Sequence, residues 1–402
     1  MIRLGNIGSA KFRNADEAYI PLDYFRELQR HEVREGDLII AGLGDSNHPV
    51  GRACLAPKGL GPAIVKADCF RARLDETRLT HRYAAWALSS SAISQQIRTL
   101  TRGTTRTRIN LDVVREVQVP MPQLEDQRRI ADFLDAETAL IDQLIATRAS
   151  QSELLDLLLG QLIDGAVAGT PEALEKLGVP ADGSTWGNGK TSRLCEVIPG
   201  YAFPSEGFSH GSGTRLLRGV NVSVDRTSWV DCAWWDETST PTPERFHLRA
   251  GDLVIGMDRP WISGGTRITF INEEDLPALL LQRVACLRPK STGIDMDFLY
   301  WNLRSSHFRR AVEGELTGVS VPHLSGDQIG SFSFPLPDAA CQKRISDRLT
   351  AHSARIRELR SRMTRQAGLL TERRQSLITA AVTGQFDVST ASGRNVTDGV
   401  SA

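Results

Sequence analysis

The sequence predicts a mixed α/β and α+β protein, in which two related globular domains are separated by two long helices that pair antiparallel as a coiled coil. Three observations support this fold class. The second half of the chain repeats the first, each copy ends in a long stripe of apolar residues at heptad spacing, and the two stripes carry opposite net charge.

The repeat runs through the chain at a shift of 215 residues. VREGDLII from Val33 aligns with LRAGDLVI from Leu248, and the aligned pairs between Pro120 and Gly169 include 19 identities. A match of this length is a stronger signal than any short motif, because chance similarity does not persist at one offset. Two copies imply two equivalent tasks.

The first part of each copy reads as a compact α/β domain. Short Val- and Ile-rich runs are broken by Gly and Pro, and a helical pattern follows near residues 80–99. VKADCFR from Val65 fits QRVACLR from Gln282 better at a shift of 217, which predicts a small insertion that is later compensated. Residues 186–215 open the second copy and have no counterpart before Met1, so the first domain is trimmed, its start is misplaced, or the segment is completed by other means.

The second part of each copy is predicted to be a long helix. Apolar residues recur at steps of four and three, with Glu137, Arg148 and Gln151 in the polar slots of the first stripe. The register covers about 33 residues, or roughly 50 Å of helix. The seam residues are Ile130, Leu134, Ile141, Leu144, Leu155, Leu158 and Leu162 in the first copy, and Ile345, Leu349, Ile356, Leu359, Met363, Leu370 and Leu377 in the second, where His352, Gln366 and Arg373 take the polar slots.

Charge indicates how these stripes are used. Residues 125–164 hold nine acids and three bases, whereas the aligned residues 340–379 hold three acids and ten bases. Opposite charge favours pairing between the two helices. Each stripe alone is equally compatible with ordinary core packing.

These signals divide the chain into six parts. Gly, Pro and polar residues mark the boundary between the copies. The expected parts are a first globular domain, shortened at its N-terminus, at 1–122, a spacer helix at 123–169, a linker at 170–185, a second globular domain at 186–337, a second spacer helix at 338–388 and a flexible tail at 389–402.

Composition excludes several classes of protein. Lys and Arg total 48 and Asp and Glu total 48, so any nucleic-acid surface must come from local segregation of charge. Six scattered cysteines without a CxxC pair indicate free thiols in a reducing compartment. There is no apolar run of membrane-spanning length and no signal-peptide pattern, so we expect a cytoplasmic protein.

Catalytic motifs are missing from the sequence. It contains no GxxxxGK[ST] loop, no HExxH, no GxSxG and no complete GxGxxG after a strand. It also lacks the Asn-Pro-Pro-aromatic motif of amino-methyltransferases. The eight dispersed histidines suggest no metal site. We therefore expect a non-catalytic chain that holds no cofactor or metal.

A basic segment is the main candidate for DNA contact. Residues 78–110 contain six arginines and no acid, and arginine can contact either guanine or phosphate. A solvated basic face is the alternative reading. The candidates here are Arg102, Thr104, Thr105, Arg106 and Arg108, with Thr317, Ser320 and His323 at the matching turn of the second copy.

The loop after each GDL strand offers a second set of candidates. These loops are GLGDSNHPVGR from Gly42 and GMDRPWISGGTR from Gly256. Trp261 fits a packing role equally well. The candidates are Asn47, His48, Arg52, Arg259, Trp261 and Arg267.

The junctions between domains and helices resemble those of a known family. PMPQLEDQRRIADFL and, less fully, PLPDAACQKRISDRL are followed by helices that end in LIDGAVAG and LITAAVTGQFDV. With the order domain, helix, domain, helix, this resembles the DNA-specificity subunits of Type I restriction-modification systems. Cys341 stands where the first copy has Asp126, so contact with a methylation subunit could be weaker there.

The resemblance implies a division of labour within a larger complex. Each target-recognition domain would read one half of a bipartite, asymmetric DNA site. The helices would set the gap between the halves and dock two methylation subunits, and restriction subunits would join through the complex. S-adenosylmethionine, ATP and magnesium would serve the partner chains.

Two other functions compete with this interpretation. A self-contained nuclease or methyltransferase would act without partners. A two-lobed protein-protein adaptor would bind partners without sequence-dependent DNA affinity, and would tolerate loss of Arg102, Arg106 and Arg108.

Overall fold

The computed structural model describes residues 1–14, 17–45, 48–101, 108–180, 186–209, 211–238, 242–262, 264–290, 292–313 and 323–388. The chain forms two compact units. Unit 1 comprises Met1–Ser150 and Arg362–Ala402, and unit 2 comprises Gln151–Ser361. Each unit therefore combines one globular domain with parts of two long helices.

Unit 1 holds a small α/β domain. Its elements are α1 (Leu22–Glu27), β1 (Glu32–Val33), β2 (Leu38–Ala41), β3 (Ala53–Leu55), β4 (Ala63–Ile64), β5 (Cys69–Ala72), α2 (His81–Leu88), α3 (Ser91–Leu100) and α4 (Leu111–Glu116), followed by the first part of α5 (Leu124–Ala168) and the last part of α11 (Ala339–Thr383).

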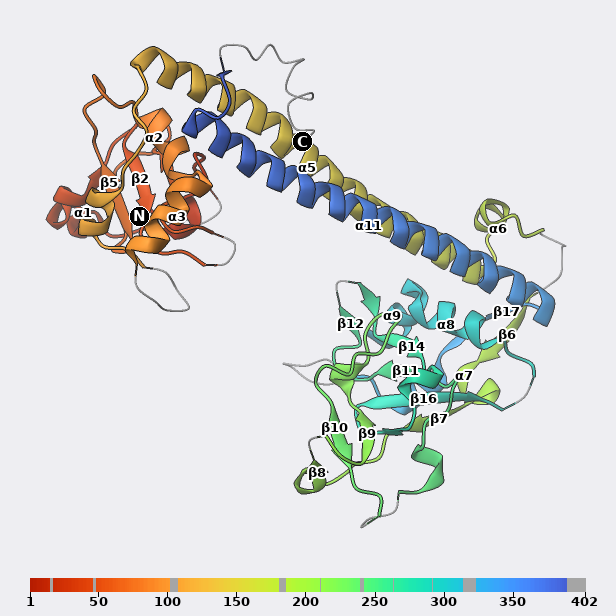
Figure 1. Cartoon of the computed structure of the whole chain (residues 1–402). Coiled ribbons are helices and arrows are strands. Elements are labelled where there is room, and N and C mark those ends of the chain that lie inside the picture. The colour runs from red at the N-terminus through yellow and green to blue at the C-terminus, as the bar shows by residue number, and fades with distance from the viewer. Residues whose placement is uncertain are drawn as a thin grey trace. The chain divides into compact units, whose positions relative to one another are not determined.

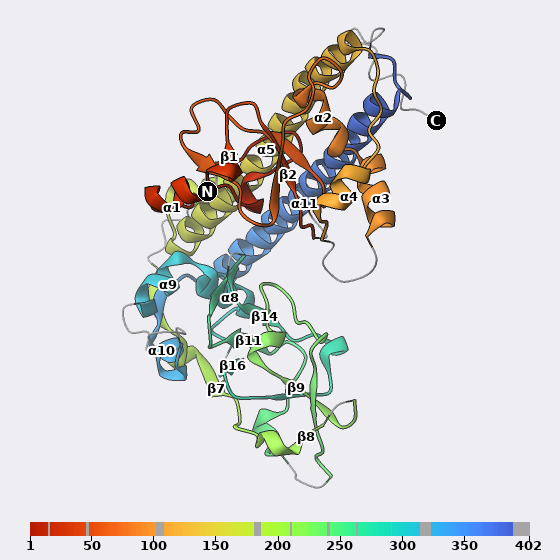
Figure 2. The same ribbon diagram turned by 90° about the vertical axis from the view of Figure 1, so that its left-hand side faces the viewer.

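The central sheet of unit 1 is antiparallel, in the order β3-β2-β5. Helix α2 packs against it, as Figures 1 and 2 show. All four residues of β2 are buried, which matches its unbroken apolar sequence. One core cluster joins Leu38 and Ile40 to Ala84, Ala85 and Leu88 of α2.

Unit 2 is larger. Its elements are the last part of α5, α6 (Pro171–Leu177), β6 (Gly187–Lys190), α7 (Thr191–Leu194), β7 (Cys195–Pro199), β8 (Phe208–Ser209), β9 (Thr214–Leu217), β10 (Ala233–Trp235), β11 (Leu253–Gly256), β12 (Trp261–Ile262), β13 (Gly265–Thr266), β14 (Ile268–Phe270), β15 (Ala278–Leu280), β16 (Val284–Pro289), α8 (Met296–Arg304), α9 (Ser306–Glu313), α10 (Gly326–Ser331), β17 (Ser333–Leu336) and the first part of α11.

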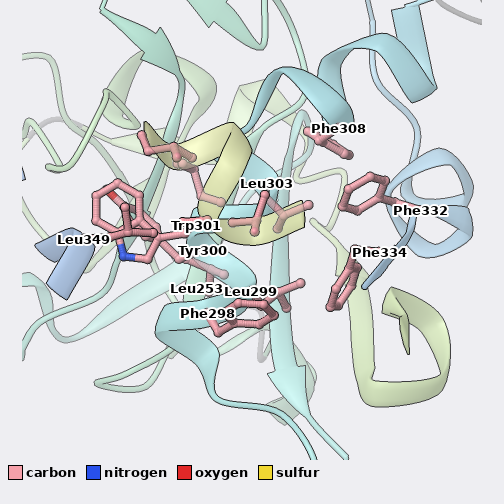
Figure 3. Packing of buried hydrophobic residues seen from close by; sticks show 14 of the residues in the cluster. Leu253, Phe298, Leu299, Tyr300, Trp301, Leu303, Phe308, Phe332, Phe334 and Leu349 are labelled. Carbon is pink, nitrogen blue, oxygen red and sulfur yellow. The ribbon is translucent and has the colours of Figure 1, made fainter. Parts of the chain in front are cut away.

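Two four-stranded sheets form the core of unit 2, in the orders β14-β11-β16-β7 and β15-β9-β10-β8. Helix α8 packs Phe298, Leu299 and Trp301 into the largest apolar cluster, which also contains Phe308 of α9 and Leu349 of α11 (Figure 3). Strand β7 lies outside β16, and β6 pairs with β17. All three of β6, α7 and β7 come from residues 186–215, the stretch without a counterpart in the first copy.

Strand register corrects one expectation about the repeat. Leu38 pairs with Ala72 in unit 1, and Leu253 pairs with Leu287 in unit 2. Both partners are therefore related by 215, and the shift of 217 proposed for the segment from Val65 is wrong. A matching pair of cysteines favoured that shift, but pairing with the buried central strand fixes the register.

A buried carboxylate and arginine pair recurs in both domains. Arg73 donates to both oxygens of Asp37 at 2.6 and 2.8 Å, and the aligned Arg288 does the same for Asp252 at 2.8 and 2.7 Å. Burial alone would raise the pKa of Asp37, but the bonds from Arg73 and from the Arg34 N–H leave it lowered. Such bidentate pairs fix geometry as well as adding energy.

Helix starts also repeat. Thr80 caps α2 by accepting from the Tyr83 N–H, and the aligned Asp295 caps α8 by accepting from the Phe298 N–H. Ser90 caps α3 in the same way. Side-chain oxygens satisfy N–H groups that lack a partner in the first turn. The predicted helical pattern near residues 80–99 is thus two helices, interrupted at the capping serine.

A buried glutamine joins each domain to its long helix. The Gln127 side chain accepts from the Thr80 N–H and donates to the carbonyls of Arg78 and Pro122. The aligned Gln342 accepts from the Asp295 N–H and donates to the carbonyls of Gly293 and Pro337. The glutamine of the junction motif therefore acts as a structural joint.

The long helices each span 45 residues and run antiparallel within each unit. In unit 1 Arg374 of α11 contacts Asp142 of α5 at 2.9 Å, and in unit 2 Arg360 contacts Asp156 at 2.8 Å. Basic residues of α11 thus meet acidic residues of α5, as their charges predict. Figures 1 and 2 show the two helices side by side.

The predicted seam needs correction along both helices. Ile130, Leu134 and Ile141 are buried, but Leu144 and Leu158 are each 49% exposed, so these two assignments are wrong. The neighbouring Leu159 is buried instead. A straight α-helix drifts about 20° per heptad from a strict 3.5-residue repeat, which moves the inward face by one position.

The remaining apolar seam residues lie on the inward side or close to it. The apolar ones are buried or partly buried: Leu155, Leu162, Ile345, Leu349, Ile356, Leu359, Met363, Leu370 and Leu377. The polar slots of the second helix are exposed, namely His352, Gln366 and Arg373. Ser353, one position after His352, is buried.

No helix within the described ranges is both long and apolar enough to span a membrane. Cys54, Cys69 and Cys195 are buried. Burial raises the pKa of Cys54 and Cys69 to about 12 and that of Cys195 to about 11. These thiols therefore stay protonated at neutral pH.

Candidate nucleic-acid interface

Three chain segments meet at the end of the central strand in each domain. In unit 1 the Gly42 N–H donates to the Asp68 carbonyl at 2.8 Å, and the Ile109 N–H donates to the Gly42 carbonyl at 2.9 Å. In unit 2 the aligned bonds run from Met257 to Arg283 at 2.9 Å and from Leu324 to Met257 at 2.8 Å. The two domains therefore build the same backbone frame here.

Unit 1 places an acid and a base on this frame. Arg108 contacts Asp68 at 3.2 Å, and its side chain is 67% exposed. Leu43, the residue aligned with Asp258, forms a backbone bridge with Arg108. His48, in the neighbouring loop, contacts Asp45 at 3.1 Å and is 42% exposed.

Unit 2 places three polar side chains on the same frame. Asp258 accepts from His323 at 2.8 Å and from Arg283 at 3.2 Å. Arg283 is 55% exposed. The adjacent Arg259 is exposed as well. This cluster combines donors and an acceptor at a solvent-accessible surface, as readout of base edges requires.

The frame in unit 2 also holds strained backbone. Arg283 has φ of 72° and Arg259 has φ of 45°. A residue other than glycine in this left-handed region costs on the order of 1–3 kcal/mol, and such residues cluster at functional sites. Neither aligned residue of unit 1, Gly44 or Asp68, has a positive φ.

Arg52 and Arg267 serve the scaffold, and their assignment to DNA contact is wrong. Arg52 is 5% exposed, and its Nε donates to the Ile7 carbonyl at 2.8 Å. The aligned Arg267 donates from Nε to the Val222 carbonyl at 2.9 Å. Burial lowers the pKa of both guanidinium groups. Each arginine ties the loop after the central strand to the segment that contains Ile7 in unit 1 and Val222 in unit 2.

Trp261 packs inside unit 2. Its ring centroid lies 6.4 Å from that of Phe308, and the Arg309 guanidinium lies over the ring at 5.5 Å. Among the residues that the structure describes, its buried indole N–H has no acceptor. The packing alternative accounts for these contacts.

The other predicted contacts lie outside the described residues. These are Asn47, Arg102, Thr104, Thr105, Arg106, Thr317 and Ser320. Arg108 and His323, at the ends of the two segments that contain most of them, are described. Both lie on the shared frame.

Sequence reasoning missed Asp68, Asp258 and Arg283. The shift of 217 misaligned the segment that contains Asp68 and Arg283, so their equivalence was hidden. At the shift of 215 they align, and a charge reversal at one position of a repeat is a signal that the sequence does contain. Asp258 lies beside the candidate Arg259, but a carboxylate alone gives no signal for DNA contact.

The chain matches the family described as Type I restriction modification DNA specificity domain over residues 30–151 and 235–364. Together these ranges cover more than half of the chain, once in each copy of the repeat. The chain belongs to this family. It is accordingly a specificity component, with its two family matches falling on the two globular domains and the helices that follow them.

Curated relatives of this specificity protein carry the same description. It is 26% identical over 324 residues to the Type I restriction enzyme MjaVIII specificity subunit of Methanocaldococcus jannaschii, covering 79% of this chain and 72% of that one. It is 35% identical over 157 residues to the EcoAI specificity subunit of Escherichia coli, covering 39% and 26%. These relatives are named as specificity subunits, which assigns the chain recognition rather than catalysis.

Solved structures share the fold. A chain from a study of complex assembly and conformational transition of the type I R-M system superposes with a TM-score of 0.68 at 21% identity, covering 88% of this chain and 83% of that one. The HsdS subunit from Thermoanaerobacter tengcongensis gives 0.52 at 21% identity, covering 88% and 82%. The expected fold class, with repeated mixed domains and long helices, is confirmed.

Proposed function

We propose that this specificity protein reads a bipartite, asymmetric DNA sequence, one half with each globular domain. The observation that carries the proposal is the shared frame at the end of the central strand. It presents Leu43, Asp68 and Arg108 in one domain, against Asp258, Arg283 and His323 in the other. Equal scaffolds with unequal polar groups suit the reading of two different sequences.

The two alternative functions receive less support. An adaptor that binds two equivalent partners gains nothing from different side chains on identical frames. A self-contained enzyme is disfavoured because the relatives are specificity subunits.

The proposal extends to partners by resemblance. The long helices would dock two methylation subunits, and restriction subunits would join through that complex. S-adenosylmethionine, ATP and magnesium would be bound by those partners, and the assembly would act in the cytoplasm. The junction glutamines support this arrangement, because they fix each domain to a long helix to which a partner subunit would bind.

The deciding experiment is single-molecule sequencing of genomic DNA from cells that express this chain with a Type I methylation subunit. Cells with the methylation subunit alone are the control. We expect a methylated, bipartite motif that appears only when the chain is present. Methylation that needs no second subunit would favour the enzyme, and partner binding without any motif would favour the adaptor.

The spacer role is tested by changing helix length. Insertion of four residues near Gln151 should change the gap between the half-sites and leave both half-sites intact. The helix would then act as a ruler, because each residue adds about 1.5 Å. A gap that stays constant would contradict this role.

A further inference from the structure

We infer that three aligned positions determine base specificity in each domain: 43, 68 and 108 in the first, and 258, 283 and 323 in the second. The inference rests on the proposed function and deepens it. It assigns the central base contact to Arg108 in the first half-site and to Arg283 in the second, and it gives guanine as the base that each arginine reads.

The contrast between conserved and exchanged positions carries this inference. Scaffold residues are identical in the two copies: Asn6 and Asn221, Asp37 and Asp252, Arg52 and Arg267, Arg73 and Arg288, Gln127 and Gln342. At the three frame positions every side chain differs, although the backbone hydrogen bonds between them are the same. Different side chains within the same hydrogen-bonded frame are what a change of sequence preference requires.

The two frames carry their arginine and its aspartate on different segments. Each frame presents an exposed arginine held by an aspartate, but the two residues come from different segments. Arg108 is held by Asp68, whereas Arg283 is held by Asp258. The arginine moves from the third segment to the second, so its guanidinium reaches the DNA from a different point of the same frame.

The contacts that hold the Arg283 guanidinium leave some of its N–H donors to bind a base. Asp258 and His323 both contact Nη1 of Arg283. An arginine has five N–H donors, so Nε and Nη2 still provide the paired donors that match O6 and N7 of guanine. Holding one edge of the guanidinium lowers the entropy that is lost when the other edge binds.

Backbone strain in unit 2 agrees with this placement. Arg283 has a φ of 72°, in a turn where only glycine would adopt this conformation without strain. The Met257 N–H holds the Arg283 carbonyl at 2.9 Å and fixes that turn. The structure thus keeps a strained arginine in the position that faces solvent.

The test uses the complete complex with a methylation subunit and scores the methylated motif. We expect Arg283→Ala to lower discrimination at one base pair of one half-site about ten- to hundred-fold, with the other half-site unchanged. Arg108→Ala should do the same at the other half-site. Arg283→Lys should keep DNA affinity and lose discrimination, since lysine cannot make the bidentate contact.

Matched control residues lie just before the central strands β2 and β11, at the end opposite the frame. Arg249 is 60% exposed and contacts Glu244 at 3.4 Å, and the aligned Arg34 is 68% exposed and contacts Glu32 at 3.0 Å. Arg249→Ala and Arg34→Ala should leave both half-sites unchanged.

Three outcomes would overturn the inference. Unchanged motifs in Arg283→Ala and Arg108→Ala would remove these residues from the site. Uniform weakening on all sequences, with a lower salt dependence of binding, would identify phosphate contacts instead. Absence of any methylated motif with the unmodified chain would refute the proposed function itself. If the unmodified chain and the control variants give the motif, a failure of the inference concerns Arg108 and Arg283 alone.

Discussion

The first globular domain ends its central sheet at β5, whereas the second places β7 outside the aligned strand β16. Among the described residues, the same backbone edge thus has no paired strand in unit 1 and is paired with β7 in unit 2. In unit 1 this edge borders a groove of about 530 Å³, lined by residues that include Tyr24, Phe70 and Leu111. In unit 2 the residue aligned with Leu111 is Gly326, which lies close to Pro199 at the end of β7.

The shared frame at the end of the central strand is unaffected by this difference in the outer strand. The hydrogen bonds that join the three loop segments are present in both domains, with and without the outer strand. The buried Asp–Arg pairs and the junction glutamines are also present in both. The frame therefore does not require the outer strand, and the additional segment of unit 2 pairs with the edge of its sheet.

The long helices show a second contrast. Position 159 in unit 2 is a buried leucine, whereas the aligned position in unit 1 is Arg374, which contacts Asp142 at 2.9 Å and lies over the ring of Trp86. At this level of the helix pair, unit 2 has apolar packing and unit 1 has an ion pair. Four predictions test these contrasts.

The largest effect is expected from the buried ion pair. Arg288→Ala leaves Asp252 without its partner at a site where the two side chains are 15% and 6% exposed, so we expect a loss of about 3–5 kcal/mol in unfolding free energy. Arg73→Ala should cost less, because Arg73 is 40% exposed and water can replace it.

Urea unfolding followed by tryptophan fluorescence measures the effect of Arg288→Ala, since six of the seven tryptophans lie in residues 186–301. Far-ultraviolet circular dichroism adds the first domain. Equal losses for the two variants would show that exposure does not distinguish the two pairs.

The helix contrast predicts a smaller loss. Leu159→Ala should cost about 2–4 kcal/mol, because it opens a cavity in the packed face. Arg374→Ala should cost about 1 kcal/mol, since it removes a partly exposed ion pair. Leu158→Ala is the control and should stay within about 0.5 kcal/mol, as expected for a surface position. A larger loss at Leu158 than at Leu159, measured by urea unfolding, would restore the strict heptad register.

The junction glutamines should behave alike in both domains. Gln127→Ala and Gln342→Ala each remove a buried amide that makes three hydrogen bonds, and each should cost about 2 kcal/mol. Limited proteolysis at the domain–helix junction, together with urea unfolding, measures the loss. Gln143→Ala, at an exposed position of α5, should change nothing. Loss in only one domain would contradict a common joint.

The smallest effect concerns the sheet edge. Amide hydrogen exchange should be at least about tenfold faster in β5 than in β16, because within the described part of the chain β5 has a hydrogen-bonded neighbour strand on one side only. The central strands β2 and β11 serve as internal references and should be protected to a similar degree. Equal protection of β5 and β16 would show that something covers the open edge in solution.

The sequence predicted the repeat, the long helices and the charge pairing between them, because these depend on periodicity and on aligned residue types that recur over many positions. It also indicated the loops after the GDL strands, where part of the shared backbone frame lies. The domain boundaries stay predictions, and the residues proposed for DNA contact in the undescribed segments do too.

Other features followed only from the tertiary structure. Arg52 looked like a DNA contact because arginine is common at such surfaces, yet its guanidinium is enclosed by backbone carbonyls that the fold brings together from distant positions. The inward positions of the helices shifted by one residue because a straight helix does not follow a strict heptad.

The sequence by itself thus determined that the chain is a duplicated protein with two paired helices, since duplication and charge are properties of residue order. The tertiary structure decided which arginines support the scaffold and which face solvent, and it aligned Asp68 with Arg283. The physical reason is that strand pairing fixes register through many hydrogen bonds at once, whereas local sequence similarity can favour a register two residues away.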